Sequence, residues 1–130
     1  MSHHRHAVHA AGAPPAAGPY SHAVESGGLL YCSGQVPLDP DTGRLVEGSI
    51  GDQARQCLEN LTTVCAQAGV KLSDAVRMSV YVTDISTFAQ VNEVYGSYFE
   101  SDPPARTTIG VAALPGGAQI EMDAIVALSD

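Results

Sequence analysis

The chain has 130 residues, of which 45% are hydrophobic and 15% charged, and its net charge is −8. This length and balance describe one compact domain and exclude a disordered chain. The 6 Lys and Arg residues are scattered, so the chain lacks the basic stripe that nucleic acids or anionic membranes require. No stretch reaches the roughly 20 apolar residues of a membrane span, and no leucine-rich signal segment opens the chain. We therefore expect a cytoplasmic protein.

Cysteine and histidine usage argues against a disulfide framework or a metal centre. The three cysteines form no CxxC motif, so we expect buried free thiols at Cys32, Cys57 and Cys65. The histidines near the N-terminus have no converging further ligand, and we expect no physiological metal site among them. They are His3, His4, His6 and His9.

The N-terminal part of the chain is predicted to be an extension, residues 1–17, ahead of a single domain over residues 18–130. Residues 5–10 (RHAVHA) predict a short edge strand, and a proline-containing linker follows. Pro19 restricts the backbone, so Tyr20 lies on a stiff bend.

Two short strands are predicted next, over residues 22–25 and 29–33, joined by a Gly-Gly turn. Gly34 follows the second strand and predicts a bulge or a place where another group approaches the backbone closely. The Pro and Gly residues within residues 36–46 predict a loop there.

Residues 49–68 predict a helix, because apolar residues recur there at spacings of three and four. Ser49 is a suitable N-cap with Asp52 three residues later, and Gly69 suits the other end. Residues 75–83 predict a strand by alternation, with Val76, Met78, Val80 and Val82 on its apolar face.

A second helix is predicted from Asp84 to about Phe99, before an Asp-Pro-Pro break. Its inward residues share a helical spacing, and Asn92 lies beside them, where a polar amide needs a partner or a cavity. The inward set is Phe88, Val91, Val94, Tyr95, Tyr98 and Phe99.

The last strands are predicted over residues 106–113 and 118–128, linked by Leu-Pro-Gly-Gly. This element order favours an α+β fold, with two helices on one face of a mixed, mostly antiparallel sheet. The last strand is apolar on both faces, because Ile125 and Ala127 oppose the residues expected in the core. Two helices cover only one face, so we expect other subunits to close the second.

Motifs for nucleotide binding and for serine hydrolases are absent: there is no Walker-type loop, no GxGxxG after a strand and no GxSxG. His22 is the single histidine outside the N-terminal cluster, which leaves one fragile candidate for a triad base. The chemical candidates that remain are Tyr20, Ser33, Asn92, Arg106 and Glu121. A guanidinium suits the anchoring of a small acid, and a carboxylate on the next strand could orient water. Arg106 and Glu121 could equally form a simple cross-strand ion pair.

Several segments resemble the RidA family, also called YjgF. They are GPYSHAV (18–24), CSGQVPLDPDTGRLV (32–46), VYVTDISTFAQVNEVYGSYF (80–99) and PARTTIGVAALPGGAQIEMDAI (104–125). The resemblance runs from about Gly18 almost to the C-terminus, and P-A-R…L-P…I-E-M is its diagnostic pattern.

The resemblance implies a chorismate-mutase-like α+β fold, assembled as a homotrimer with active sites between subunits. It also implies hydrolysis of 2-aminoacrylate/2-iminopropanoate and 2-iminobutanoate to 2-oxo acids and ammonia, without metal or organic cofactor. These intermediates come from pyridoxal-phosphate dehydratases that act on serine and threonine.

Position by position, the resemblance implies that Arg106 binds the substrate carboxylate and that Glu121 holds the attacking water. The expected pocket lining is Tyr20, Ser33, Gly34, Asn92 and the backbone at Thr108.

Two positions depart from the family pattern: Thr108 stands where many members have Cys, and His22 where Gln is common. Three alternatives remain open from the sequence. The first is action on another imine, such as an aminomuconate-like acid, and the second is a ligand-sensing or binding role for the same cleft. The third is an endoribonuclease, which the net charge disfavours.

Overall fold

The structure is a computed structural model that describes residues 4–129, so His3 lies outside the described residues. The elements follow the predicted order, with three short 3₁₀ turns added. In chain order they are β1 (His6–Val8), β2 (Ala23–Ser26), β3 (Leu29–Gln35), α1 (Ile50–Gln67), a 3₁₀ turn (Leu72–Asp74), β4 (Ala75–Val82), a 3₁₀ turn (Ile85–Thr87), α2 (Phe88–Tyr98), β5 (Ala105–Gly110), a 3₁₀ turn (Pro115–Gly117) and β6 (Ile120–Ala127).

The strands form one six-stranded sheet in the order β1-β2-β3-β6-β4-β5. Only the β4–β5 pair is parallel, and the other neighbours run antiparallel. The predicted mixed, mostly antiparallel sheet with an N-terminal edge strand is confirmed. The prediction that the last two strands are neighbours is wrong, because β4 lies between β5 and β6.

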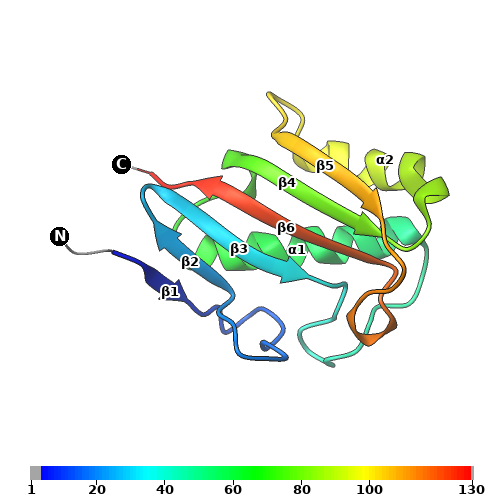
Figure 1. The fold of residues 1–130 in the computed structure, drawn as a ribbon, viewed down its shortest axis with the longest axis horizontal. Helices are drawn as coiled ribbons and strands as arrows, with labels where there is room; N and C mark the ends of the chain where they lie inside the picture. Colours follow the sequence, from blue (N-terminus) through cyan, green and yellow to red (C-terminus); the bar gives the residue numbers. More distant parts are fainter. Residues whose placement is uncertain (1–3, 130) are drawn as a thin grey trace.

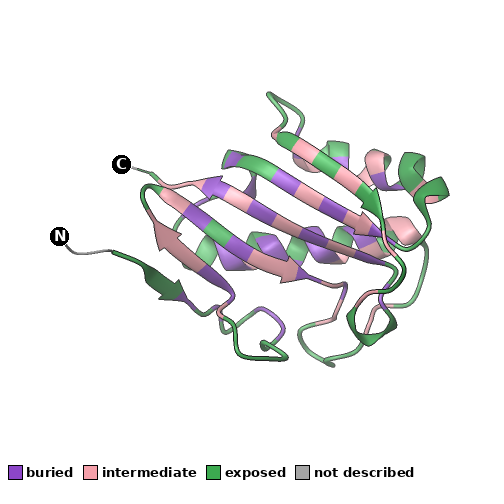
Figure 2. Cartoon of the chain, in the orientation of Figure 1, coloured by how far each residue is buried: buried purple, intermediate pink, exposed green. Residues whose placement is uncertain are grey.

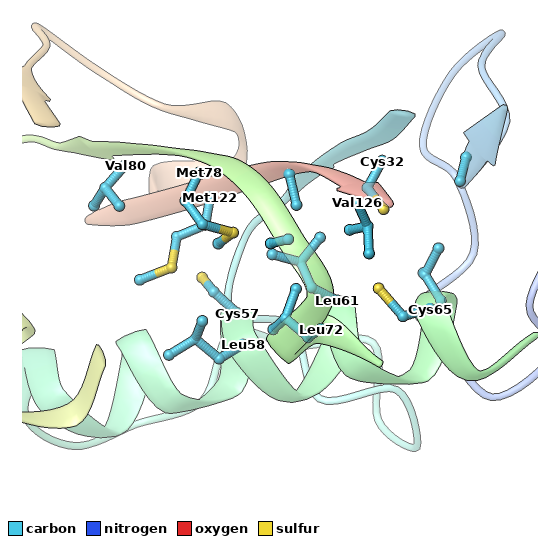
Figure 3. Close-up of a cluster of buried hydrophobic side chains, with 14 of the residues drawn as sticks. Cys32, Cys57, Leu58, Leu61, Cys65, Leu72, Met78, Val80, Met122 and Val126 are labelled. Atoms are coloured by element: carbon cyan, nitrogen blue, oxygen red, sulfur yellow. The ribbon is translucent and has the colours of Figure 1, made fainter. Parts of the chain in front are cut away.

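Both helices pack on one face of the sheet, behind it in the view of Figure 1. Helix α1 begins with the predicted capping box, in which Ser49 Oγ accepts from Asp52 N–H and Asp52 reaches back to Ser49 N–H. The chain leaves α1 through Gly69, whose φ of +77° places it in the left-handed region. The core lies between α1 and the sheet, where Leu58 and Leu61 meet Met78 and Met122 (Figure 3).

The three cysteines are free and buried, as predicted. Cys32 on β3 and Cys65 on α1 face each other across this core (Figure 3). Burial raises the pKa of the Cys57 thiol.

Two apolar side chains expected inside lie outward. Val76 is exposed because the pairing of β4 with β6 shifts between Ala75 and Arg77. The inward–outward alternation of side chains is broken at this irregularity, and Val76 faces outward. Phe88 is exposed because α2 begins only there: the residues from Ile85 form a 3₁₀ turn, capped by Asp84. Val91, Tyr95 and Phe99 are buried as predicted.

The second face of the sheet carries no helix and lies toward the viewer in Figures 1 and 2. We call it the open face. Tyr31 on β3 and Ile125 on β6 are register partners there, and Tyr31 is 44% exposed. Glu121 and Asp123 share this face, since they alternate along β6 with the buried Ile120 and Met122. Among the described residues, no helix has the length and apolar character needed to cross a membrane.

Candidate functional site

A cavity of about 420 Å³ lies where β3 and β6 meet the N-terminal segment. Tyr20, Ser33, Gly34 and Glu121 line it, so these four predicted residues come together. The rest of its wall is mostly apolar and comes from residues 14–17 and from the loop after β3. These wall residues include Pro14, Pro15, Ala16, Ala17, Val36, Leu38 and Leu45.

The Glu121 carboxylate rests directly on the backbone of Gly34. A methyl group at Gly34 would overlap Glu121 Oε2 and would lie 2.9 Å from Cδ. The pairing of β3 with β6 is irregular between Cys32 and Gln35, so Gly34 is at a bulge. Both predictions for Gly34, a bulge and a close approach, are confirmed.

Tyr20 and Ser33 are held by backbone groups. Ser33 Oγ donates to the carbonyl of Ser21 at 2.6 Å, and Tyr20 Oη accepts from Ala17 N–H at 3.1 Å. The tyrosine hydrogen stays available to a ligand, and the tyrosine ring stays exposed at the rim of the cavity.

Burial and charge together raise the pKa of Glu121. Desolvation is the larger cause, and the negative charge of Asp123 adds to it. Asp123 is itself held by Tyr81, whose hydroxyl donates to Oδ2 at 3.0 Å. A carboxyl group with a raised pKa is well suited to exchange protons with water near neutral pH.

Two buried polar side chains anchor the walls of the cavity. His22 Nδ1 accepts from Ala10 N–H at 2.9 Å, so its Nε2–H donates to the Pro14 carbonyl at 2.8 Å. Asn60 Nδ2 on α1 donates to the Leu38 carbonyl at 2.9 Å. His22 is thus occupied in structure, which removes the candidate triad base.

The other predicted residues lie in a second place, between α2 and β5. Arg106 and Thr108 pair with Met78 and Val80 of β4, both buried, so their side chains point to the helix side. The Arg106 guanidinium carbon lies 4.6 Å from the Tyr95 ring centre and 5.3 Å from that of Phe88.

Three buried polar atoms in this region have no hydrogen-bond partner in the described chain: Asn92 Oδ1, Tyr95 Oη and Thr108 Oγ1. Such atoms are rare in folded proteins, because each carries an unrecovered desolvation cost of about 1–3 kcal/mol. Tyr95 contacts Arg106, Thr108 lies on the same strand as Arg106, and Asn92 lies about one turn from Tyr95 on α2, so these residues form a candidate binding site. We call Asn92, Tyr95, Arg106 and Thr108 the arginine cluster.

One chain does not bring Arg106 and Glu121 together. Their strands are separated by β4, where Arg106 pairs with Met78 and Glu121 pairs with Tyr81. Met78 and Tyr81 point to opposite faces, since they lie an odd number of residues apart. The alternative of a cross-strand ion pair within the chain is therefore wrong.

No group of three or more His, Cys, Asp or Glu side chains is placed to share a metal ion, as far as residues 4–129 are concerned.

Comparison with known proteins identifies the family. The family model described as Endoribonuclease L-PSP matches residues 10–128. The chain belongs to the RidA/YjgF family. One relative of this RidA/YjgF protein is Protein DfrA of Myxococcus xanthus, 49% identical over 93% of this chain and 94% of the relative. Another is the human 2-iminobutanoate/2-iminopropanoate deaminase, 42% identical over 93% of this chain and 88% of the relative.

Solved structures agree with this family. The crystal structure of RidA from a Psychrobacter species superimposes with a TM-score of 0.90 at 41% identity, covering 95% of this chain and 99% of that one.

The candidate site of this RidA/YjgF protein is lined or supported by residues that sequence reasoning missed. Asn60 lies among the apolar residues of α1. A polar side chain at a position predicted to face inward is the one sequence feature that could have indicated its structural role. Residues 14–17 were predicted to be part of a linker, but they form a wall of the cavity. Tyr95 was expected in the core, and no sequence signal indicated its contact with Arg106.

Proposed function

We propose that this protein is a deaminase that hydrolyses small enamine and imine acids, 2-aminoacrylate/2-iminopropanoate and 2-iminobutanoate, to 2-oxo acids and ammonia. The observation that carries the proposal is the arginine cluster. A guanidinium fork and the unpartnered Thr108 hydroxyl offer donors to the carboxylate of a small acid, and Asn92 Oδ1 can accept from its nitrogen. The name of the human relative, a 2-iminobutanoate/2-iminopropanoate deaminase, supports the choice of substrate.

The complete site is proposed to form between two copies of the chain in a homotrimer. One copy contributes the arginine cluster, and its neighbour contributes Glu121 with the cavity beside Gly34. The separation of Arg106 and Glu121 within a chain requires this arrangement if both act on one substrate. The uncovered apolar positions Tyr31 and Ile125 provide a surface on which copies can pack.

The proposed reaction needs only positioning and proton transfer. Arg106 binds the carboxylate and holds the imine carbon beside a water that hydrogen-bonds to Glu121. As the water oxygen bonds to that carbon, Glu121 takes a proton from the water and passes it to the nitrogen. Glu121 then carries the hydroxyl proton of the resulting carbinolamine to its nitrogen, and the carbon–nitrogen bond breaks as the carbonyl forms, so that ammonia leaves and the 2-oxo acid remains. The raised pKa of Glu121 favours both transfers.

The activity test uses 2-iminobutanoate generated in the assay by a threonine dehydratase. The protein is expected to accelerate ammonia release, and Arg106→Ala to abolish that acceleration while the oligomer persists. Ammonia release at the same rate with and without the wild-type protein would refute the deaminase assignment. Full activity in Arg106→Ala would show that Arg106 is structural.

A mixing experiment tests the two-copy site directly. Arg106→Ala and Glu121→Ala are each expected to be inactive. If they are unfolded together in equal amounts and refolded, one site in about four should combine an intact Arg106 with an intact Glu121 from the neighbour. Activity near a quarter of the wild-type level is expected. No recovery on mixing, when wild-type protein treated in the same way regains its activity, would refute the two-copy site.

The family description also raises RNA cleavage as a second activity. The net charge of −8, with 6 scattered Lys and Arg residues, opposes binding of a phosphate backbone. We therefore retain the small acid as the substrate class.

A further inference from the structure

The aromatic face of α2 offers a specific role for Tyr95, and this role rests on the proposed function of Arg106 as a carboxylate anchor. Phe88 and Tyr95 lie seven residues apart on α2, two turns along nearly the same side of the helix. The Arg106 guanidinium from β5 lies over both rings, at 4.6 Å from Tyr95 and 5.3 Å from Phe88. Both distances are within the range of cation–π attraction.

The kind of partner matters for what Arg106 can bind. A ring attracts the face of a guanidinium and leaves the N–H donors around its edge free. A carboxylate partner would occupy those donors and cancel the charge. Within the part of the chain that the structure describes, the Arg106 guanidinium contacts these two rings and forms no hydrogen bond or ion pair. The rings therefore orient the arginine without consuming its binding capacity.

Tyr95 is better placed for this role than Phe88. Tyr95 is only 7% exposed and packs against Phe99 with ring centres 4.7 Å apart, so its ring is fixed in the core. Phe88 is exposed at the start of α2. Burial also raises the pKa of Tyr95 to about 12, which keeps it from forming a phenolate that would pair with Arg106.

We propose that Tyr95 is a positioning residue of the site: its buried ring holds the Arg106 guanidinium in the orientation that presents a free donor edge to the ligand's carboxylate. The ring, and not the hydroxyl, carries this role. The Thr108 hydroxyl, buried on the same strand without a hydrogen-bond partner, can donate to that carboxylate beside Arg106.

The test compares Tyr95→Phe, which keeps the ring, with Tyr95→Leu, which removes it. The probe is 2-oxobutanoate, measured by calorimetry, with 2-butanone as the matched ligand without a carboxylate. We expect Tyr95→Phe to bind 2-oxobutanoate within about twofold of wild type and Tyr95→Leu to bind it about tenfold more weakly. The KM for 2-iminobutanoate should rise in parallel with this Kd, and the weak binding of 2-butanone should not change.

Val91→Ala is the control for damage to the helix, because it removes buried apolar volume from α2 and leaves both rings that contact Arg106 in place. It should lower the midpoint of thermal unfolding and leave the Kd for 2-oxobutanoate unchanged. Wild-type affinity in Tyr95→Leu would overturn the proposal, and so would equal weakening in Tyr95→Phe and Tyr95→Leu.

The same measurements separate this inference from the proposed reaction. If the wild-type protein binds 2-oxobutanoate through Arg106 but does not accelerate imine hydrolysis, the reaction is wrong and the role of Tyr95 is still decided by the Kd values. If imine hydrolysis is accelerated and Tyr95→Leu retains the wild-type KM, the reaction stands and the role of Tyr95 is wrong.

Discussion

At the scale of single residues, the contact between Gly34 and Glu121 is the tightest constraint at the site. The carboxylate occupies the space that a side chain at position 34 would fill, so the bulge of β3 and the place of the carboxylate depend on each other. Glycine is required at position 34 because Glu121 approaches the backbone closely. Backbone strain is not the reason, since the φ angle of Gly34 is not positive.

The first prediction concerns Gly34→Ala. The added methyl group must push the Glu121 carboxylate aside, and a displacement of about 1 Å can cost about a hundredfold in rate. We expect kcat/KM for 2-iminobutanoate to fall by about that factor. Gly96→Ala on α2 is the matched control, because a methyl group there meets nothing within 4 Å. A rate unchanged in Gly34→Ala would mean that the position of Glu121 is not critical.

The second prediction concerns Asp123→Asn and pH. Asp123 raises the pKa of Glu121 by charge repulsion, in addition to the larger effect of burial. Glu121 must be ionised to accept the proton of water, so activity falls as the pH drops through its pKa. Removal of the Asp123 charge lowers that pKa, and the acidic limb of the pH–rate profile should therefore move to lower pH.

The asparagine can still accept the hydrogen bond of Tyr81, so the geometry around position 123 is preserved. Asp41→Asn, in an exposed loop, removes one charge elsewhere and should leave the profile in place. A shift of the acidic limb to higher pH in Asp123→Asn would contradict the assignment.

At the scale of elements, two buried side chains join the cavity walls to the fold. His22 on the approach to β2 holds residues 10–14, and Asn60 on α1 holds the loop after β3. Each satisfies backbone groups that no strand or helix can reach.

The third prediction concerns Asn60→Ala. Asn60 is only 2% exposed, and its loss leaves the Leu38 carbonyl without its donor. The free energy of unfolding in urea should fall by about 2 kcal/mol. Gln67→Ala, on the exposed side of the same helix, should change it by no more than about 0.5 kcal/mol. Equal effects of the two substitutions would refute an anchoring role for Asn60.

At the scale of the whole molecule, two features of the single chain point to an oligomer: the uncovered open face of the sheet and the separation of Arg106 from Glu121. Apolar side chains on that face are left uncovered, and Arg106 cannot reach Glu121 within a chain. A second copy packed beside the first would answer both requirements.

The fourth prediction therefore concerns Tyr31→Arg. An arginine at this exposed position leaves the single chain intact but places an unpaired charge in any interface formed by the open face. Light scattering should show a trimer for the wild type and monomers for this variant, with loss of deaminase activity. Gln67→Arg on α1 lies on the opposite side of the sheet and should remain trimeric. A monomeric wild type would contradict both the interface and the two-copy site.

The sequence by itself determined the elements of this protein. Periodicity and capping in residues 49–68 predicted α1, alternation predicted the strands, and the count of helices predicted a sheet with one uncovered face. These signals are local, because a few neighbouring residues decide which side of a helix or strand is apolar.

Only the tertiary structure decided how the candidate residues are grouped. The order of strands places β4 between β5 and β6, and the register of the two pairings puts Arg106 and Glu121 on opposite faces of the sheet. The same packing brings Tyr95 under Arg106 and residues 14–17 over Glu121. Strand order depends on long-range burial between segments far apart in the chain, and no local pattern records it.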